Sequence, residues 1–174
     1  MEKTVSTDSP RLSAVAEERE GLQLSHFDYE FAWNLGSRIR AKAAAADLPV
    51  AIEIRHGTDV IFSTLVGKAT IDNLDWARRK GAVAHRFHKS SLEVRLEAQE
   101  NSYDFNAHFR LPTTDYVASG GGFPLIIRGG LLIGTAAVSG LPDVEDHRLI
   151  VEALKDMTGR PRDNPADSST DFRY

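Results

Sequence analysis

The sequence contains no cysteine, which excludes disulfide bonds, thiolate metal sites and a cysteine nucleophile. No run of 18 apolar residues occurs, and residues 1–10 lack the apolar core of a signal peptide. Positive charge is not in excess either. The net charge is -4 and the isoelectric point is about 5.9, so neither nucleic acid nor an anionic membrane is expected as a partner. We expect a cytoplasmic protein.

What remains is an ordinary globular composition, with 41% hydrophobic and 26% charged residues in a chain of 174 residues. This length is enough for one domain with a sizeable core. Residues 1–24 are rich in Ser, Thr, Glu and Arg, and we expect them to form a mobile tail. The pattern predicts a single domain over residues 25–158 and a C-terminal tail over residues 159–174.

Glycine is concentrated in residues 119–140, which hold more than half of the 13 glycines. Two apolar runs on either side of Arg128-Gly129-Gly130 predict a buried β-hairpin. The three glycines at positions 120–122 have two interpretations. They can arrange backbone amides into a small anion-binding concavity, or they can let two backbones approach closely. We favour the second interpretation.

The other elements follow from periodicity and capping residues. Apolar residues at four-residue steps predict a helix over residues 28–46 with Asp28 as its N-cap. Two β-rich runs at residues 50–55 and 60–65 predict a second hairpin, and their alternation indicates a solvent-exposed face that carries Glu53 and Arg55. Three further helices are predicted, at residues 72–89 (N-cap Asp72 or Asp75), 90–101 and 142–158.

The element order is therefore α-β-β-α-α-β-β-α, which predicts an α+β fold with a central antiparallel sheet flanked by helices. The two hairpins must pair edge to edge or through a short extra strand at residues 115–118. Residues 103–114 contain aromatic and charged residues without a clear period, and we interpret them as a functional or interface loop.

Several short motifs carry a resemblance to a known family: Gly121-Gly122-Phe123-Pro124, Gly134, Val138-Ser139-Gly140-Leu141-Pro142 and Asp146-His147. In these the sequence resembles the haem-degrading, HbpS-like family, which includes GlcG-type proteins, and it is closest to the mostly uncharacterised small-protein branch. The resemblance implies a profilin-like α/β fold, a dimer-based homo-oligomer and, in some members, binding or degradation of haem. That branch often carries His before the paired glycines, where this chain has Ser119, so a ligand role there is not carried over.

The segment His85-Arg86-Phe87-His88 is the candidate for binding haem iron. Imidazole is the commonest protein ligand of haem iron, and two histidines three residues apart lie close together on one helical surface. His88 borders the predicted apolar stripe and is the preferred iron ligand. Arg78, Arg79 or Arg86 would then pair with the propionates. A solvated, basic helix face is the simpler explanation of the same residues.

Other candidates are weaker. His108 and Arg110 lie in the irregular loop, where binding residues concentrate, and the glycine segment contributes Gly120, Gly121, Gly122 and Phe123 as possible ligand contacts. The pair Asp146-His147 is explained by the electrostatics of a helix N-terminus alone. Ser139 lacks the flanking glycines of a nucleophile elbow, and the acidic residues lack divalent-metal spacing, so neither a hydrolase nor a divalent-metal site is expected.

The sequence thus predicts an oligomeric small-molecule-binding protein whose candidate ligand is haem, with or without haem-degrading activity. The alternative is a non-catalytic structural or partner-binding assembly module that binds no haem. Whether the protein is an enzyme stays open at this level.

Overall fold

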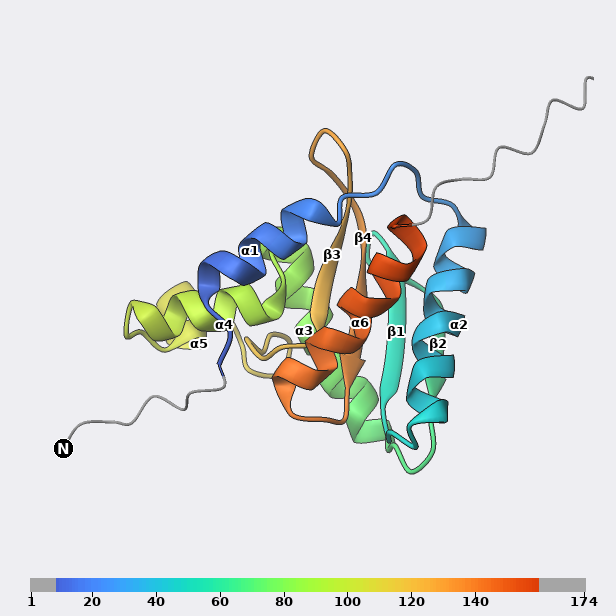
Figure 1. Ribbon diagram of the computed structural model, residues 1–174. Helices are drawn as coiled ribbons and strands as arrows, with labels where there is room; N and C mark the ends of the chain where they lie inside the picture. The colour runs from blue at the N-terminus through green and yellow to red at the C-terminus, as the bar shows by residue number, and fades with distance from the viewer. Residues whose placement is uncertain (1–8, 160–174) are drawn as a thin grey trace, which may run out of the picture.

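The computed structural model describes residues 9–159 and contains one antiparallel sheet of four strands in the order β2-β1-β4-β3 (Figure 1). The strands are β1 (Ala51–His56), β2 (Asp59–Leu65), β3 (Gly122–Ile127) and β4 (Leu131–Ser139). Both predicted hairpins are confirmed, and they pair edge to edge because β1 lies beside β4, with Ile52 opposite Val138. Residues 115–118 form no strand.

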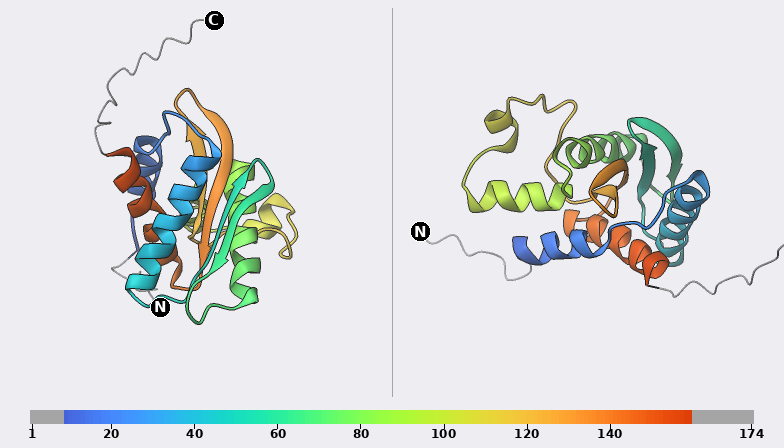
Figure 2. Two further views of the ribbon diagram at one scale, coloured as in Figure 1. Left: turned by 90° about the vertical axis from the view of Figure 1, so that its right-hand side faces the viewer. Right: turned by 90° about the horizontal axis from the view of Figure 1, so that it is seen from above.

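Six helices surround the sheet within the described residues: α1 (Leu12–Gly21), α2 (Tyr29–Ala45), α3 (Ile71–Phe87), α4 (Ser91–Glu100), α5 (Phe105–Phe109) and α6 (Asp143–Thr158). In the left view of Figure 2, α2 and α6 lie on one side of the sheet and α3 on the other. The predicted α+β fold with a central antiparallel sheet is therefore confirmed. Among residues 9–159, no helix is long and apolar enough to cross a membrane.

The larger core lies between the sheet and the helices α2 and α6. Leu35 and Ile39 of α2 meet Ile52 and Ile54 of β1 there, and all four side chains are fully buried. The alternation in β1 thus places isoleucines in this core, as predicted.

The opposite face of β1, expected to be exposed to solvent, is instead covered by α3. Glu53 is only 5% exposed and forms an ion pair with Arg55, whose Nε lies 2.6 Å from the Glu53 carboxylate. The prediction failed because a polar residue in a strand does not reveal whether a helix packs over it.

Helix α1 corrects the expectation of a mobile tail for residues 12–21; residues 1–8 of the predicted tail lie outside the described residues. Val15 of this helix is buried against Leu92 and Leu96 of α4, and its Arg19 forms an ion pair with Glu93. The sequence did not reveal this helix because it carries no amphipathic pattern. Its contacts with the rest of the protein depend largely on residues of α4, far away in the sequence. The C-terminal tail predicted from residue 159 lies, from residue 160 on, outside the described residues.

Two local predictions also change. The N-cap of α3 is Thr70 rather than Asp72 or Asp75, because Thr70 and Asn73 each accept a hydrogen bond from the other's backbone N–H. The predicted irregular loop contains the short helix α5, whose Phe105 is buried in a second apolar cluster with Val83 and Val94. By contrast, the N-cap Asp28 is confirmed, since its carboxylate accepts the N–H of Phe31 at 2.6 Å.

Candidate functional site

A groove of about 340 Å³ lies between α3, the β1–β2 turn and the segment at residues 115–116, and we call it the α3 groove. It is lined by Arg55, Gly57, Thr58, Arg78, Gly81, Ala82, His85, Arg86, Asp115, Tyr116 and Thr135. Its volume is within the range of pockets that bind small molecules. Two of the predicted ligand residues, His85 and Arg86, therefore line the same groove.

The sequence builds this groove from a helix that packs closely on the sheet. A Cβ atom at Gly81 would lie 3.6 Å from both Ala137 and Thr135, so the helix is already in contact with β4 at this point. Gly57 supplies the positive φ of +58° that the β1–β2 turn requires. Alternation in β1 then directs Arg55 to the α3 side of the sheet.

The three arginines of the groove differ in how much of their hydrogen-bonding capacity is already used. Arg78 is engaged by Asp75 at 2.9 Å, by Asp115 at 3.4 Å and by the backbone carbonyl of Thr114 at 2.7 Å. Its hydrogen bond to Asp75 lowers the pKa of that carboxyl and raises the pKa of Arg78. Arg78 therefore holds the 114–115 segment against α3 and is a poor candidate for a propionate ligand.

Within residues 9–159, only the Nε and Nη1 of Arg55 are used, by Glu53 and by the carbonyl of Thr58 at 2.7 Å, so part of its guanidinium group is available. Arg86 is the least committed: its guanidinium carbon lies 5.8 Å from the centre of the Tyr116 ring, and it has no carboxylate partner within residues 9–159. A carboxylate in the groove would therefore find its strongest counter-charge at Arg86.

His85 is half-buried in the last turn of α3 and lines the groove. Its ring makes no hydrogen bond to another described residue, so the imidazole is available to a ligand. His88, the iron ligand preferred from sequence, is instead the C-cap of α3 with φ of +54°, is exposed and does not line the groove. The helical-wheel argument failed because the helix ends one residue before His88.

The donor set fits the polar parts of haem. His85 offers an imidazole nitrogen of the kind that binds haem iron, and Arg86 and Arg55 offer guanidinium groups of the kind that bind propionates. Apolar side-chain surface in this groove is limited to Ala82 and the ring of Tyr116, which would cover part of a porphyrin ring.

The remaining predicted ligand residues are not brought to the α3 groove. His108 stacks on Tyr103, with ring centres 4.1 Å apart, and Arg110 is the exposed C-cap of α5. In the segment predicted as a functional loop, His108 thus packs at the edge of a small aromatic cluster.

The glycine tract is a buried junction. A Cβ atom on Gly120, Gly121 or Gly122 would meet the backbone carbonyl oxygen of Asp143, Val138 or Lys80, respectively. Two of the amides are already bonded, since Gly120 N–H donates to Asp143 at 3.0 Å and Gly122 N–H donates to Ser91 at 2.7 Å. Close backbone approach, the interpretation we favoured, explains these contacts, and Phe123 follows as a core residue that is 1% exposed.

The sequence argument missed a buried ion pair beside this junction. Lys80 Nζ of α3 lies 2.7 Å from Asp146 of α6, and both side chains are almost completely buried. Burial raises the pKa of Asp146 to about 6, against the opposing effects of Lys80 and the amides of Leu141 and Gly140. Asp146 is therefore more than a helix-capping residue. One signal was available: Lys80 falls on the same stripe of α3 as Ala77 and Ala84.

Within the part of the chain that the structure describes, no group of three or more His, Asp or Glu side chains could hold a metal ion. The candidate site is thus a half-buried histidine beside a free arginine, in a groove that no single motif of the sequence encodes.

We compared the sequence and the structure with those of known proteins. A family model described as "Haem degrading protein HbpS-like" matches residues 27–155. A UPF0303 protein from Paraburkholderia phymatum is 43% identical over 143 residues, which cover 82% of this chain and 87% of that protein. Helix α1 lies before the residues that the family model matches.

Two solved structures share the fold. The crystal structure of the Ybr137w protein has a TM-score of 0.78 and 27% identity, and the match covers 87% of this chain and 89% of that one. The crystal structure of a PduOC:heme complex has a TM-score of 0.63 and 21% identity, over 74% of this chain and 92% of that one. The second likeness concerns the fold alone.

Proposed function

Because the chain belongs to the haem-degrading HbpS-like family, we propose that it binds a carboxylate-bearing small molecule in the α3 groove, with haem as the first ligand to test. The observation that carries this proposal is the convergence of His85 and Arg86 on one groove beside the partly uncommitted Arg55. A solved relative of the same fold is a complex with haem, which supports haem as the test ligand.

In this proposal each group has a separate task. His85 would hold the iron through a ring nitrogen, Arg86 would bind one propionate, and Tyr116 would contact the ring of the ligand. Arg78 would not contact the ligand. It would instead hold in place the segment that carries Tyr116. A bound haem would supply the redox-active iron on which any degradation of the haem depends.

We propose further that the protein assembles into a dimer-based homo-oligomer. Two large apolar side chains one turn apart on α2 are exposed: Tyr29 (65%) and Trp33 (61%). Such a group of apolar side chains is typical of an interaction surface. The alternative function, an assembly module without haem, rests on this same surface.

An absorbance titration with hemin separates the two functions. We expect a saturable shift of the Soret band for the wild-type protein and a loss or marked change of that shift for His85→Ala. The matched control is His88→Ala, an exposed histidine three residues away that lies outside the groove. A featureless titration of the wild-type protein would favour the assembly module, and a loss of the shift in His88→Ala alone would move the site out of the groove.

A further inference from the structure

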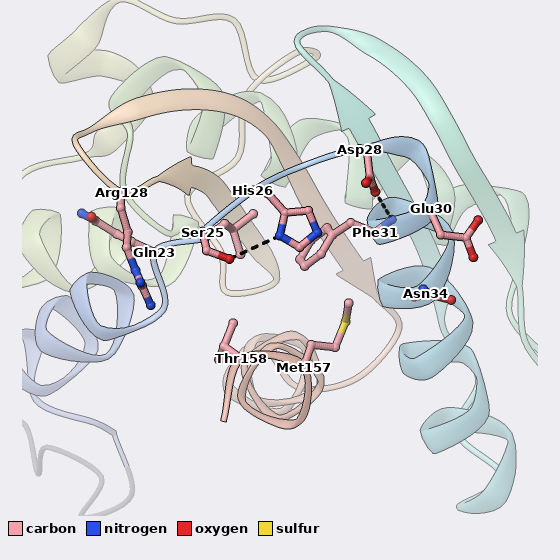
Figure 3. A pocket seen from close by; sticks show the side chains of 11 residues that line it. Gln23, Ser25, His26, Asp28, Glu30, Phe31, Asn34, Arg128, Met157 and Thr158 are labelled. Carbon is pink, nitrogen blue, oxygen red and sulfur yellow. Dashed lines mark hydrogen bonds between the residues drawn. The ribbon is translucent and has the colours of Figure 1, made fainter. Parts of the chain in front are cut away.

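A second cavity, of about 520 Å³, lies on the other side of the sheet, between the start of α2, the end of α6 and the β3–β4 turn (Figure 3). We call it the α2–α6 pocket. It is lined by Gln23, Leu24, Ser25, His26, Asp28, Glu30, Phe31, Asn34, Arg128, Met157 and Thr158. None of these residues belongs to the α3 groove, so the two cavities are separate sites.

The pocket has an apolar floor. Leu24 is 1% exposed and Phe31 is 8% exposed, and the half-buried Met157 of α6 lies beside them. The floor is fixed in place, because the N–H of Leu24 donates to Ile126 at 2.7 Å and its carbonyl accepts from Arg128 N–H at 2.8 Å. The pocket can therefore bury an apolar group without rearranging its walls.

Charges of opposite sign lie at opposite ends of the pocket. Figure 3 shows Arg128 and Gln23 at one end and, at the other, Asn34 and the exposed Glu30 of α2, whose carboxylate stands at the outer rim of the pocket. No side chain of residues 9–159 forms an ion pair with Arg128 or Glu30. By contrast, the third charged residue, Asp28, is already used as the N-cap of α2.

Two amide side chains also line the pocket. Gln23 and Asn34 each offer two N–H donors and a carbonyl acceptor, and neither is hydrogen-bonded to another side chain of the described chain. Such groups match the alternating donors and acceptors of peptide bonds. The wall thus combines a cationic end, an anionic end, amide groups and an apolar floor.

From this arrangement we propose that the α2–α6 pocket binds a short peptide with free ends. The C-terminal carboxylate of the peptide lies at Arg128 and its N-terminal ammonium group lies at Glu30. Its backbone meets Gln23 and Asn34, and an apolar side chain rests on Phe31 and Met157. In Figure 3 the floor residues Phe31 and Met157 lie between Arg128 and Glu30.

Isothermal titration of the full chain with the tripeptide Ala-Leu-Ala, and with its N-acetylated and C-amidated forms, tests this proposal. We expect each cap to weaken binding by about two- to fivefold, the effect of losing one exposed ion pair. Arg128→Gln should weaken the free tripeptide as much as amidation does and leave the amidated form unchanged. Glu30→Gln should do the same with respect to acetylation.

The matched controls are Arg40→Gln and Glu100→Gln, exposed charges on α2 and α4 that do not line the pocket. Both should bind the free tripeptide as the wild type does, and all variants should keep the wild-type melting temperature. Equal affinity for free and capped tripeptides, or no binding of any of them, would overturn the proposal. Hemin titration of the same variants reports on the α3 groove separately, so failure of one site does not imply failure of the other.

Discussion

The pairing of Lys80 with Asp146 makes one carboxyl group of the core sensitive to pH. Because burial raises the pKa of Asp146 from 3.8 to about 6, the folded protein binds a proton here that the unfolded chain releases near pH 4. This group therefore stabilises the fold fully below pH 4, and the contribution is lost as pH rises toward 6. A difference of about two pKa units corresponds to about 3 kcal/mol.

Replacing Asp146 by Asn should remove this dependence. We expect the free energy of unfolding of wild type, minus that of Asp146→Asn, to fall by roughly 2 to 3 kcal/mol between pH 4 and pH 6.5. Urea unfolding at several pH values measures it. Glu18→Gln is the contrasting control: a hydrogen bond with His147 lowers the pKa of Glu18 to about 2, so its stabilisation is present above pH 4.5 and is lost on acidification. A pH-independent difference for Asp146→Asn would contradict the argument.

The glycine junction gives a second prediction. A methyl group on Gly122 would meet the backbone carbonyl of Lys80, which cannot turn away without disturbing α3. We expect Gly122→Ala to lower the free energy of unfolding by about 1 to 3 kcal/mol, as for overpacking of a core. Hemin affinity per folded molecule should stay unchanged. Gly21→Ala is the control, since no atom of residues 9–159 lies within 4 Å of the added Cβ. A variant that melts like wild type but no longer binds ligand would restore the anion-binding interpretation of the tract.

At the scale of elements, α1 depends on ion pairs more than on apolar contacts. Arg19 bonds Glu93 through two nitrogens, at 2.8 and 3.2 Å, and the Glu93 residue is 2% exposed. Val15 is the one residue of α1 that is fully buried. Detaching this helix would therefore leave a buried carboxylate without its cation.

We expect Arg19→Met to lower the free energy of unfolding by about 3 kcal/mol, because an unpaired buried charge is costly. Hydrogen exchange of the α1 amides should rise far more than that of β4. Arg11→Met, which replaces an exposed arginine just before α1, should leave both quantities near wild type. Uniform acceleration of exchange across the whole chain would indicate that α1 does not open by itself.

Sequence periodicity was sufficient for elements whose own residues make the core. Alternating isoleucines fixed β1, and the four-residue steps with Asp28 predicted α2 almost to the residue. Periodicity did not predict α1, whose contact with the rest of the protein depends on Glu93 in another helix. It also did not predict which residues pair with Arg78. The α3 groove was only half predictable. His85 and Arg86 are neighbours in sequence, whereas Arg55 and Tyr116 reach them only after the sheet has formed.

At the scale of the whole molecule, the exposed Tyr29 and Trp33, one helical turn apart on α2, predict self-association. Wild-type protein at micromolar concentration should sediment as a multiple of the 19.2 kDa chain. Trp33→Glu should shift it to smaller species, with a small fall in melting temperature because Trp33 packs edge-on against Phe62. Leu131→Glu, on the exposed β3–β4 hairpin, is the control. A wild-type mass near 19 kDa would rule out assembly.

The central pairing of β1 with β4 also sets the order in which the chain can fold. Each hairpin closes between neighbours in sequence, but Ile52 meets Val138 only after most of the chain has been synthesised. The contacts within each hairpin form in microseconds. Closing the long loop between β1 and β4 is slower. Until then the inner edge of β1 has no partner strand. In a nascent chain the first hairpin consequently presents an unpaired strand edge that can pair with another chain before β4 arrives.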